Sequence, residues 1–333
     1  MTGRGFCSLM CGLLLAACVS QRGPDTSLET HERPVVIAHR GASGYLPEHT
    51  LEAYKLAIKQ GADFIEPDLV MTKDGVLVAR HDPWLSDSTN IADIADFADR
   101  KTTLTGPDGG ELTDWFVWDF TLDEIRQLRA RQVRQGRDQS YDDTFLIPTF
   151  DEVLELASED CDTSVGFYPE TKWPSHHQAR GLDMAGALES SLSGHVAKNG
   201  CLPPLRIQSF EAEILKTLNA RTSYKLVQLV FPENWAANGT PSYALDDLAD
   251  YADGVGPYKA LLFDVSTGQP TDYAERARAL GLEVHPWTLR DDDIAPGFSS
   301  PEAEIEAILD AGATGFFTDF PDTGRKAVKE YIK

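Results

Sequence analysis

The sequence is short of basic residues, with 30 lysines and arginines against 53 aspartates and glutamates in 333 residues. The formal net charge of −23 argues against nucleic acids and anionic membrane surfaces as partners. It does not exclude an anionic substrate, because a bound metal can reverse the local sign inside a buried site. The hydrophobic share of 42% is normal for a globular protein, so one large α/β domain or two small ones can be built.

The apolar run near the N-terminus, residues 5–15, is shorter than the roughly 20 residues that span a bilayer. It follows Arg4 and leads into LAAC, which resembles a bacterial lipobox. We therefore expect residues 1–17 to be a lipoprotein-type signal peptide, with a lipid anchor on Cys18; a plain signal peptide or an uncleaved anchor are the alternatives. Polar residues 18–33 would form a tether. The expected location is the periplasmic face of a bacterial membrane, or the periplasm as a soluble protein.

Cysteine is scarce, with only five in the chain. Cys7 and Cys11 belong to the expected leader, and Cys18 would carry the lipid. Cys161 and Cys201 remain, and an exported protein could pair them in a disulfide. Sequence does not show whether their Cα atoms approach closely enough, so paired and free thiols both stay open.

No glycine-rich phosphate loop follows the first apolar run, which weakens a dinucleotide-binding open sheet as an interpretation. Short apolar runs alternate with amphipathic helical stretches, a pattern typical of parallel βα units. The candidate strands are residues 35–39, 64–72, 75–82, 164–171, 205–210, 225–231, 254–258, 284–289 and 316–320.

The second and third candidate strands are separated by Lys-Asp-Gly alone, too short for a parallel crossover and typical of a hairpin turn. The remaining alternation then supplies eight parallel strands and predicts a (β/α)8 TIM barrel in a domain covering residues 34–333. Residues 83–146 are rich in aspartate and fit no βα unit. We interpret them as a small inserted lobe beside the barrel mouth, following the hairpin.

The barrel prediction places chemistry at the carboxyl ends of the strands, the working face of such folds. His39 and Arg40 end the first strand there. Glu66 and Asp68, two residues apart, share one face of the second strand. Two adjacent carboxylates repel, and hard oxygen ligands favour Ca²⁺ or Mg²⁺ rather than zinc. The alternative is a pair of exposed acids on an edge strand.

The hairpin brings an imidazole toward this pair. A two-residue turn would set His81 opposite Asp68, roughly 5 Å away, whereas a three-residue turn would shift the register by one residue. Arg80 and Asp82 would then lie on the other face, toward solvent or capping the hairpin.

Glu170 ends the fourth candidate strand and Lys172 follows it, and they supply a third carboxylate and a second cation beside Arg40. Three carboxylates for one divalent metal, with two basic side chains for an anion, are suited to a phosphate ester. His39 and His81 could serve as general base and general acid, since histidine titrates near neutral pH.

At these residues the sequence resembles the glycerophosphodiester phosphodiesterase family, specifically its periplasmic bacterial branch. The matching stretches are HRGASGYLPEHT (39–50), GADFIEPDLVMTKDGVLVARHD (61–82), PETK (169–172), QSF (208–210), WT (287–288) and TDFP (318–321).

The resemblance implies a distorted (β/α)8 barrel with an inserted lobe, and hydrolysis of glycerophosphodiesters to an alcohol and glycerol 3-phosphate. It assigns His39 and His81 to acid–base catalysis and one divalent cation, Ca²⁺ most often or Mg²⁺, to the ligands Glu66, Asp68 and Glu170. It further implies that Arg40 and Lys172 contact phosphate and that Trp287 lines the glycerol pocket.

Two other functions remain as alternatives: a phospholipase acting on intact phospholipid, and a lipoprotein that only binds glycerophosphodiesters. The family often has a small residue and asparagine after Trp-Thr, where this chain has Leu289 and Arg290; this difference bears on the glycerol contacts. Asp319, at the end of the last strand, is expected to orient a site residue.

Overall fold

The computed structural model describes residues 33–105, 110–157, 161, 164–233, 239–264 and 268–333. The expected signal peptide and all of the expected tether except Arg33 lie outside the described residues. Within the described part of the chain, no helix combines the length and apolar character that crossing a membrane requires.

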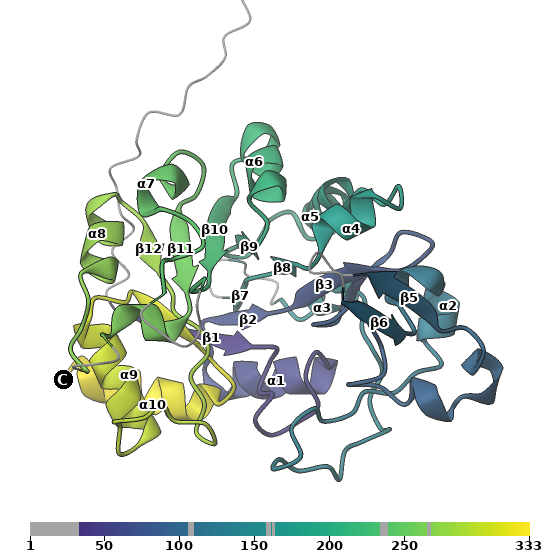
Figure 1. Cartoon of the computed structure of the whole chain (residues 1–333), viewed down its shortest axis with the longest axis horizontal. Coiled ribbons are helices and arrows are strands. Elements are labelled where there is room, and N and C mark those ends of the chain that lie inside the picture. The colour runs from purple at the N-terminus through teal and green to yellow at the C-terminus, as the bar shows by residue number, and fades with distance from the viewer. Residues whose placement is uncertain (1–32, 106–109, 158–160, 162–163, 234–238, 265–267) are drawn as a thin grey trace, which may run out of the picture. The chain divides into compact units, whose positions relative to one another are not determined.

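Parallel strands follow one another in chain order around the centre of the domain (Figure 1). They are β1 (Val35–His39), β2 (Phe64–Glu66), β7 (Gly166–Phe167), β9 (Arg206–Ser209), β10 (Lys225–Val230), β11 (Gly254–Pro257), β12 (Glu283–Val284) and β13 (Gly315–Thr318). β13 pairs with β1, and backbone amides of Thr314 and Leu289 donate to the carbonyls of Val284 and Phe317, each at 2.9 Å. These bonds join the last strands to the first, as a barrel requires.

Two of the predicted strands, 64–72 and 164–171, are not continuous. The first is broken at Pro67 into β2 and β3 (Asp68–Met71), and the second before Pro169 into β7 and β8 (Glu170–Thr171). Proline has no amide hydrogen to donate to a ladder, so pairing changes at these points. β2 pairs with β1 and β7, whereas β3 pairs with β8 and with β4 (Leu77–Ala79).

The β3–β4 hairpin forms as predicted, but its predicted register was wrong by one residue. Leu69 pairs with Ala79, and the amide of Arg80 donates to the carbonyl of Asp68 at 2.9 Å, so Arg80 rather than His81 lies opposite Asp68. The reason is a three-residue turn at 73–75, in which Gly75 adopts a φ of +81°.

Helices cover the outside of the strands (Figure 1). They are α1 (Leu51–Gln60), α3 (Phe150–Leu154), α4 (Pro174–Gln178), α5 (Met184–Asn199), α6 (Ala212–Arg221), α7 (Leu245–Leu248), α8 (Tyr273–Ala279), α9 (Pro301–Asp310) and α10 (Pro321–Tyr331), with the 3₁₀ turn η4 (Lys259–Leu262). Each amphipathic helix buries its apolar side against the strands, while the barrel interior holds Val35, Ile37, Phe64, Tyr168, Val227 and Phe317.

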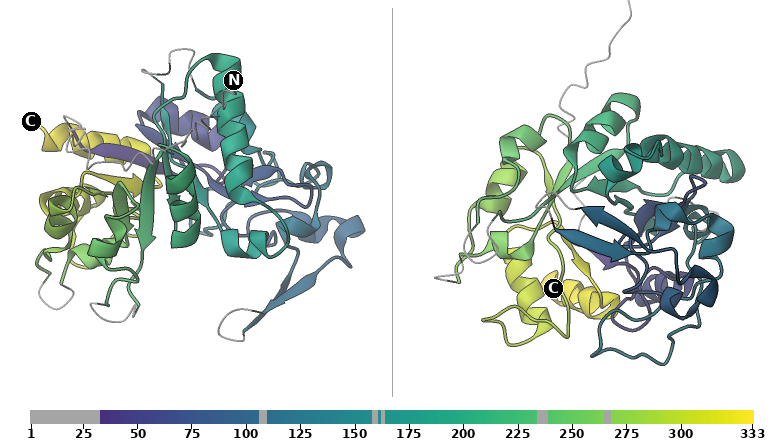
Figure 2. Two further views of the ribbon diagram at one scale, coloured as in Figure 1. Left: turned by 90° about the horizontal axis from the view of Figure 1, so that it is seen from above. Right: turned by 45° about the vertical axis from the view of Figure 1, so that its right-hand side comes forward.

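Residues 83–147 supply most of a further hydrophobic cluster, which includes Trp115 and Phe116 and is joined by Val70 of β3 and Val78 of β4. Their elements are η1 (Ile91–Asp93), η2 (Ala95–Phe97), β5 (Thr102–Thr105), β6 (Glu111–Asp114), η3 (Val117–Asp119) and α2 (Leu122–Ile125). The β5–β6 hairpin projects away from the barrel strands (Figure 2).

Cys161 and Cys201 form a disulfide with a Cα–Cα distance of 6.2 Å. The sequence left open whether these two cysteines are paired or free, and in the structure they are paired. The bond connects the segment before β7 to the segment after α5.

Candidate active site

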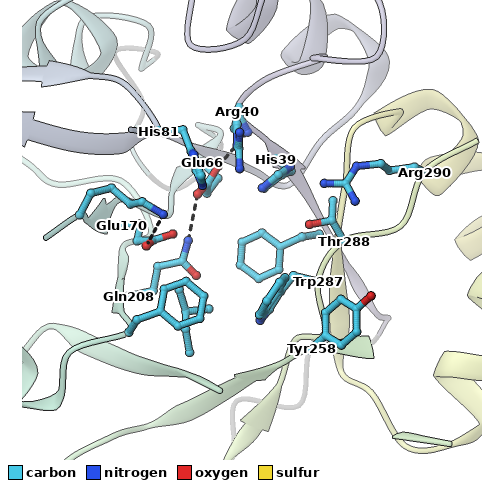
Figure 3. Close-up of a pocket in the computed structure, with 14 residues that line it drawn as sticks. His39, Arg40, Glu66, His81, Glu170, Gln208, Tyr258, Trp287, Thr288 and Arg290 are labelled. Atoms are coloured by element: carbon cyan, nitrogen blue, oxygen red, sulfur yellow. Dashed lines mark hydrogen bonds and ion pairs between the residues drawn. The ribbon is translucent and has the colours of Figure 1, made fainter. Parts of the chain in front are cut away.

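One cavity, of about 250 Å³, opens among the carboxyl ends of the barrel strands. All of the predicted site residues except Asp68 line it, namely His39, Arg40, Glu66, His81, Glu170, Lys172 and Trp287. His81, Glu66 and Glu170 lie on one side of the cavity, and Trp287, Thr288 and Tyr258 lie on the other (Figure 3). The cavity thus has a charged side and an aromatic side.

Strand register brings the three predicted metal ligands together. Asp68 on β3 and Glu170 on β8 are direct partners across the sheet, and Glu66 ends the strand just before β3. One carboxylate oxygen from each of the three residues lies within 4.8 Å of the others. The carboxylates of Glu66, Asp68 and Glu170 therefore form one buried cluster of oxygen atoms.

The electrostatics of this cluster favour a cation. Burial raises the pKa of Glu66 well above its usual value, and the charges of Asp68 and Glu170 add to that effect. Burial and the charge of Asp68 also raise the pKa of Glu170 to about 8, although Lys172 opposes this. Within the described residues, Asp68 Oδ1 is buried and accepts no hydrogen bond. Three carboxylates with an unused buried oxygen fit a hard divalent ion.

Gln208, a residue that sequence reasoning did not assign, completes the cluster. It is the register partner of Glu170 on β9, and its side-chain amide donates to Glu66 Oε1 at 3.1 Å. Its own Oε1 is buried and without a hydrogen-bond partner among the described residues. The matching stretch QSF contained this residue, but only the register shows that it faces the acids.

Arg40 has a strained backbone conformation and contacts three acidic side chains. Its φ of +58° turns the chain sharply after β1, and its amide donates to Glu66 Oε2 at 2.7 Å. Its guanidinium donates to Glu48 at 3.0 Å and lies 3.3 Å from Asp68 Oδ2. Burial raises the pKa of Glu48, but Arg40 and the neighbouring cations lower it to about 2, so Glu48 stays ionised. Glu48 was not predicted as part of the site.

His49 and Lys172 contact the carboxylates of Asp68 and Glu170, respectively. His49 bridges Asp68 Oδ2, at 2.9 Å, and the hydroxyl of Tyr54, at 2.8 Å. The Lys172 ammonium lies 3.0 Å from Glu170 Oε1. Burial lowers the pKa of Lys172, but Glu170 and Asp68 outweigh it and raise the pKa above its usual value. Lys172 is therefore a positive charge at the cavity wall.

His39 is oriented by Asp319, as the position of that residue at the end of the last strand suggested. The distance from His39 Nδ1 to Asp319 Oδ1 is 2.6 Å. Because a carboxylate accepts, Nδ1 carries the proton, and in the neutral ring Nε2 has the lone pair that can accept one. Burial and the charge of Arg40 lower the pKa of His39 to about 4, against the effect of Asp319.

His81 reaches the cavity in spite of the shifted register, because β4 ends at Ala79 and the chain turns. Its Nδ1 lies 2.9 Å from Asp82 Oδ1. Burial lowers the pKa of His81 well below its usual value, and Arg40 and Lys172 add to this. A neutral ring at neutral pH can accept a proton.

The expectation that Arg80 faces solvent or caps the hairpin was wrong, since Arg80 is only 1% exposed. The shifted register turns its side chain inward, where it interacts with the charges of Glu48 and Asp82. Burial lowers the pKa of Arg80, and these two acids oppose the effect.

The aromatic side of the cavity is built by residues after β9, β11 and β12. Trp287 packs at a right angle against Phe210, with ring centroids 5.5 Å apart, and contacts Tyr258 at 5.1 Å. Its indole nitrogen donates to the carbonyl of Gly256 at 2.7 Å. Phe210 lines the cavity as Trp287 does.

Fold and site together define a class: a parallel barrel enzyme whose strand ends hold a buried acid cluster, two imidazoles and basic side chains for an anionic ester. Comparison with known proteins agrees and is more specific. The model of the glycerophosphoryl diester phosphodiesterase family matches residues 39–323. The chain belongs to this family, and it is a phosphoric diester hydrolase.

The curated relatives include enzymes from distant organisms. A glycerophosphodiester phosphodiesterase of Arabidopsis thaliana is 36% identical over 348 residues, covering 94% of this chain and 93% of the relative. One from Haemophilus influenzae is 33% identical over 366 residues, covering 97% of both chains.

Among solved structures, an Oleispira antarctica phosphodiesterase in complex with the product sn-glycerol-3-phosphate matches with a TM-score of 0.63. The two are 24% identical, and the match covers 90% of this chain and 98% of the other. At this identity the similarity establishes the fold, a distorted TIM barrel.

Proposed function

We propose that the protein hydrolyses glycerophosphodiesters to glycerol 3-phosphate and a free alcohol, using one divalent cation held by Glu66, Asp68 and Glu170. The observation that carries this proposal is the buried cluster of three carboxylates in a cavity that also presents two imidazoles. A cavity of about 250 Å³ suits a small polar ester better than two acyl chains.

Ca²⁺ is the cation that we expect, with Mg²⁺ as the second choice. The ligands are all carboxylate oxygens, and Gln208 adds an amide oxygen beside them. When bound, such an ion stabilises the negative charge that gathers on the phosphate oxygens in the transition state.

The side chains of the cavity account for the other requirements. Arg40 and Lys172 supply positive charge for the phosphate, and the rings of Trp287 and Phe210 supply an apolar wall for the glycerol carbons. One of His39 and His81 removes the proton from the glycerol 2-hydroxyl as its oxygen attacks phosphorus. The other protonates the oxygen of the departing alcohol, and water then opens the cyclic phosphate to give glycerol 3-phosphate.

The remaining expectations from the N-terminal sequence form part of the same proposal. Cleavage before Cys18 and lipid attachment there would tether the enzyme to a membrane through residues 18–33. It would then act at the periplasmic face, where a disulfide such as Cys161–Cys201 persists.

The direct test is to incubate purified protein with glycerophosphocholine or phosphatidylcholine, with Ca²⁺ or with a chelator, and to measure released choline, together with glycerol 3-phosphate from the first substrate. We expect release from glycerophosphocholine only, and loss of release with the chelator. Cleavage of phosphatidylcholine would favour the phospholipase alternative. Binding of glycerophosphocholine without any release would favour the binding lipoprotein.

A further inference from the structure

Arg137, a residue of the 83–147 lobe, reaches into the barrel. Its side chain is 4% exposed, and its guanidinium makes bonds in three directions. Nη2 donates to Asp319 Oδ2 at 2.6 Å, and Nη1 donates to the carbonyl of Ser43 at 3.0 Å. Nε donates to Asp292 Oδ2 at 2.7 Å.

The Asp319 carboxylate receives bonds on both of its oxygens. Oδ1 accepts from His39 Nδ1, whereas Oδ2 accepts from Arg137 and from Arg290 Nε, the latter at 2.7 Å. A carboxylate bonded on both oxygens cannot rotate without losing one of these bonds. The plane of the carboxylate, and with it the direction of the His39 ring, is therefore set in part by Arg137.

The lobe also holds the loop that follows β1. Gln132 donates its side-chain amide to the carbonyls of Ser43, at 3.2 Å, and Leu46, at 3.3 Å. Ser43 in turn donates its hydroxyl to the carbonyl of His39 at 2.8 Å. Two separate routes thus run from the lobe to His39, one through the ring and one through the backbone.

We propose that Arg137 is a positioning residue for His39, so that the 83–147 lobe completes the catalytic geometry of the barrel. This inference rests on the proposed function of His39 in proton transfer. The physical reason is that Arg290 alone would leave Asp319 Oδ2 with one donor, whereas the planar fork of Arg137 joins Asp319, Asp292 and a backbone carbonyl rigidly. A small displacement of a catalytic group costs up to about 100-fold in rate.

The test compares Arg137→Ala with Arg134→Ala. Arg134 is a matched control in the same loop, since its guanidinium lies 3.6 Å from the exposed Asp293 and, among the described residues, does not pair with Asp319. We expect Arg137→Ala to lower kcat on glycerophosphocholine by roughly 10- to 100-fold with KM within twofold of wild type. Arg134→Ala should keep both constants, and Arg137→Lys should recover only part of kcat because it lacks the fork.

Two further measurements separate orientation from simple loss of stability. Asp319→Asn removes the charged acceptor, so adding Arg137→Ala to it should cost little more; a fully additive loss of kcat would overturn the proposal. ¹⁵N-edited NMR of histidine-labelled protein, with His39 assigned through His39→Asn, should show a bonded Nδ1 proton that Arg137→Ala weakens or removes at a temperature where the variant is folded.

The NMR measurement also distinguishes this inference from the proposed function. If the wild type failed to hydrolyse glycerophosphodiesters but Arg137→Ala still altered the His39 signal, the function would be wrong and the positioning correct. An unchanged His39 signal together with wild-type kcat in Arg137→Ala would overturn the positioning.

Discussion

The charged and aromatic sides of the cavity are built in different ways. On the charged side, ion pairs and hydrogen bonds link one group to the next: Arg40 to Glu48, His49 to Asp68, and Lys172 to Glu170. On the aromatic side, Trp287 packs against Phe210 and Tyr258 through ring contacts, and its indole nitrogen donates to a carbonyl. The ion pairs and hydrogen bonds of the charged side hold its groups in fixed positions. The ring contacts of the aromatic side form an apolar surface against which a substrate can pack.

This difference predicts that substitutions on the two sides change different kinetic constants. A change on the charged side removes an interaction that matters in the transition state and should lower kcat. A change on the aromatic side removes binding that substrate and transition state share, and should mainly raise KM.

The largest expected effect is the loss of an imidazole from the charged side. His81→Ala and His39→Ala should each lower kcat by roughly 10²–10⁴-fold, because each ring is proposed to transfer a proton. Steady-state hydrolysis of glycerophosphocholine measures this. His195→Ala, which changes a histidine of α5 away from the cavity, is the control. Wild-type turnover in His81→Ala would refute the acid–base scheme.

A smaller effect is expected on the aromatic side. Trp287→Ala should raise KM for glycerophosphocholine about tenfold and leave kcat within a few-fold, since the ring supplies apolar contact. Trp287→Phe keeps a ring but loses the hydrogen bond to Gly256, so its KM should lie between those of the wild type and Trp287→Ala. A loss confined to kcat would mean that the aromatic side takes part in the chemistry, and the contrast between the two sides would not hold.

The smallest expected effect is a dependence of thermal stability on pH and cation. The pKa of Glu170 is raised from 4.5 to about 8, so the metal-free fold holds this proton more tightly than the unfolded chain does. The free energy of unfolding without metal should therefore fall as pH rises from 4.5 toward 8. A cation needs the ionised carboxylate, so the gain in Tm on adding Ca²⁺ should be several degrees larger at pH 8.5 than at pH 6.

Differential scanning calorimetry with Ca²⁺ and with a chelator at both pH values measures this difference. Glu170→Gln should reduce it, whereas Glu213→Gln, which changes an exposed acid on α6, should not. An equal gain in Tm at both pH values would show that Glu170 does not ligate the ion.

The sequence predicted the charged side better than the aromatic side or the lobe contacts. Glu66, Asp68 and Glu170 follow apolar runs, and parallel strands bring their carboxyl ends to one face, so the strand pattern predicted that these three carboxylates meet. Their role as metal ligands stays a prediction. The turn length was not readable, because Asp74-Gly75 suits both two- and three-residue turns and the choice shifts the register by one residue.

Contacts between distant segments were also beyond sequence reasoning. Arg137 lies in a stretch without periodicity, and nothing local indicates that it meets Asp319, 182 positions later. Gln208 and Glu48 are polar residues whose side chains could equally have faced solvent. Only the completed barrel shows that Gln208 donates to Glu66 and that Glu48 accepts from Arg40.

The interruption at Pro67 has one more consequence. It assigns Glu66 to the four-stranded sheet and Asp68 and Glu170 to the seven-stranded sheet. An ion bound by Glu66, Asp68 and Glu170 would therefore link the two sheets at the point where they separate. Binding of such an ion should slow amide hydrogen exchange in β2 and β3 together, so the proposed cation would also limit local opening of the two strands.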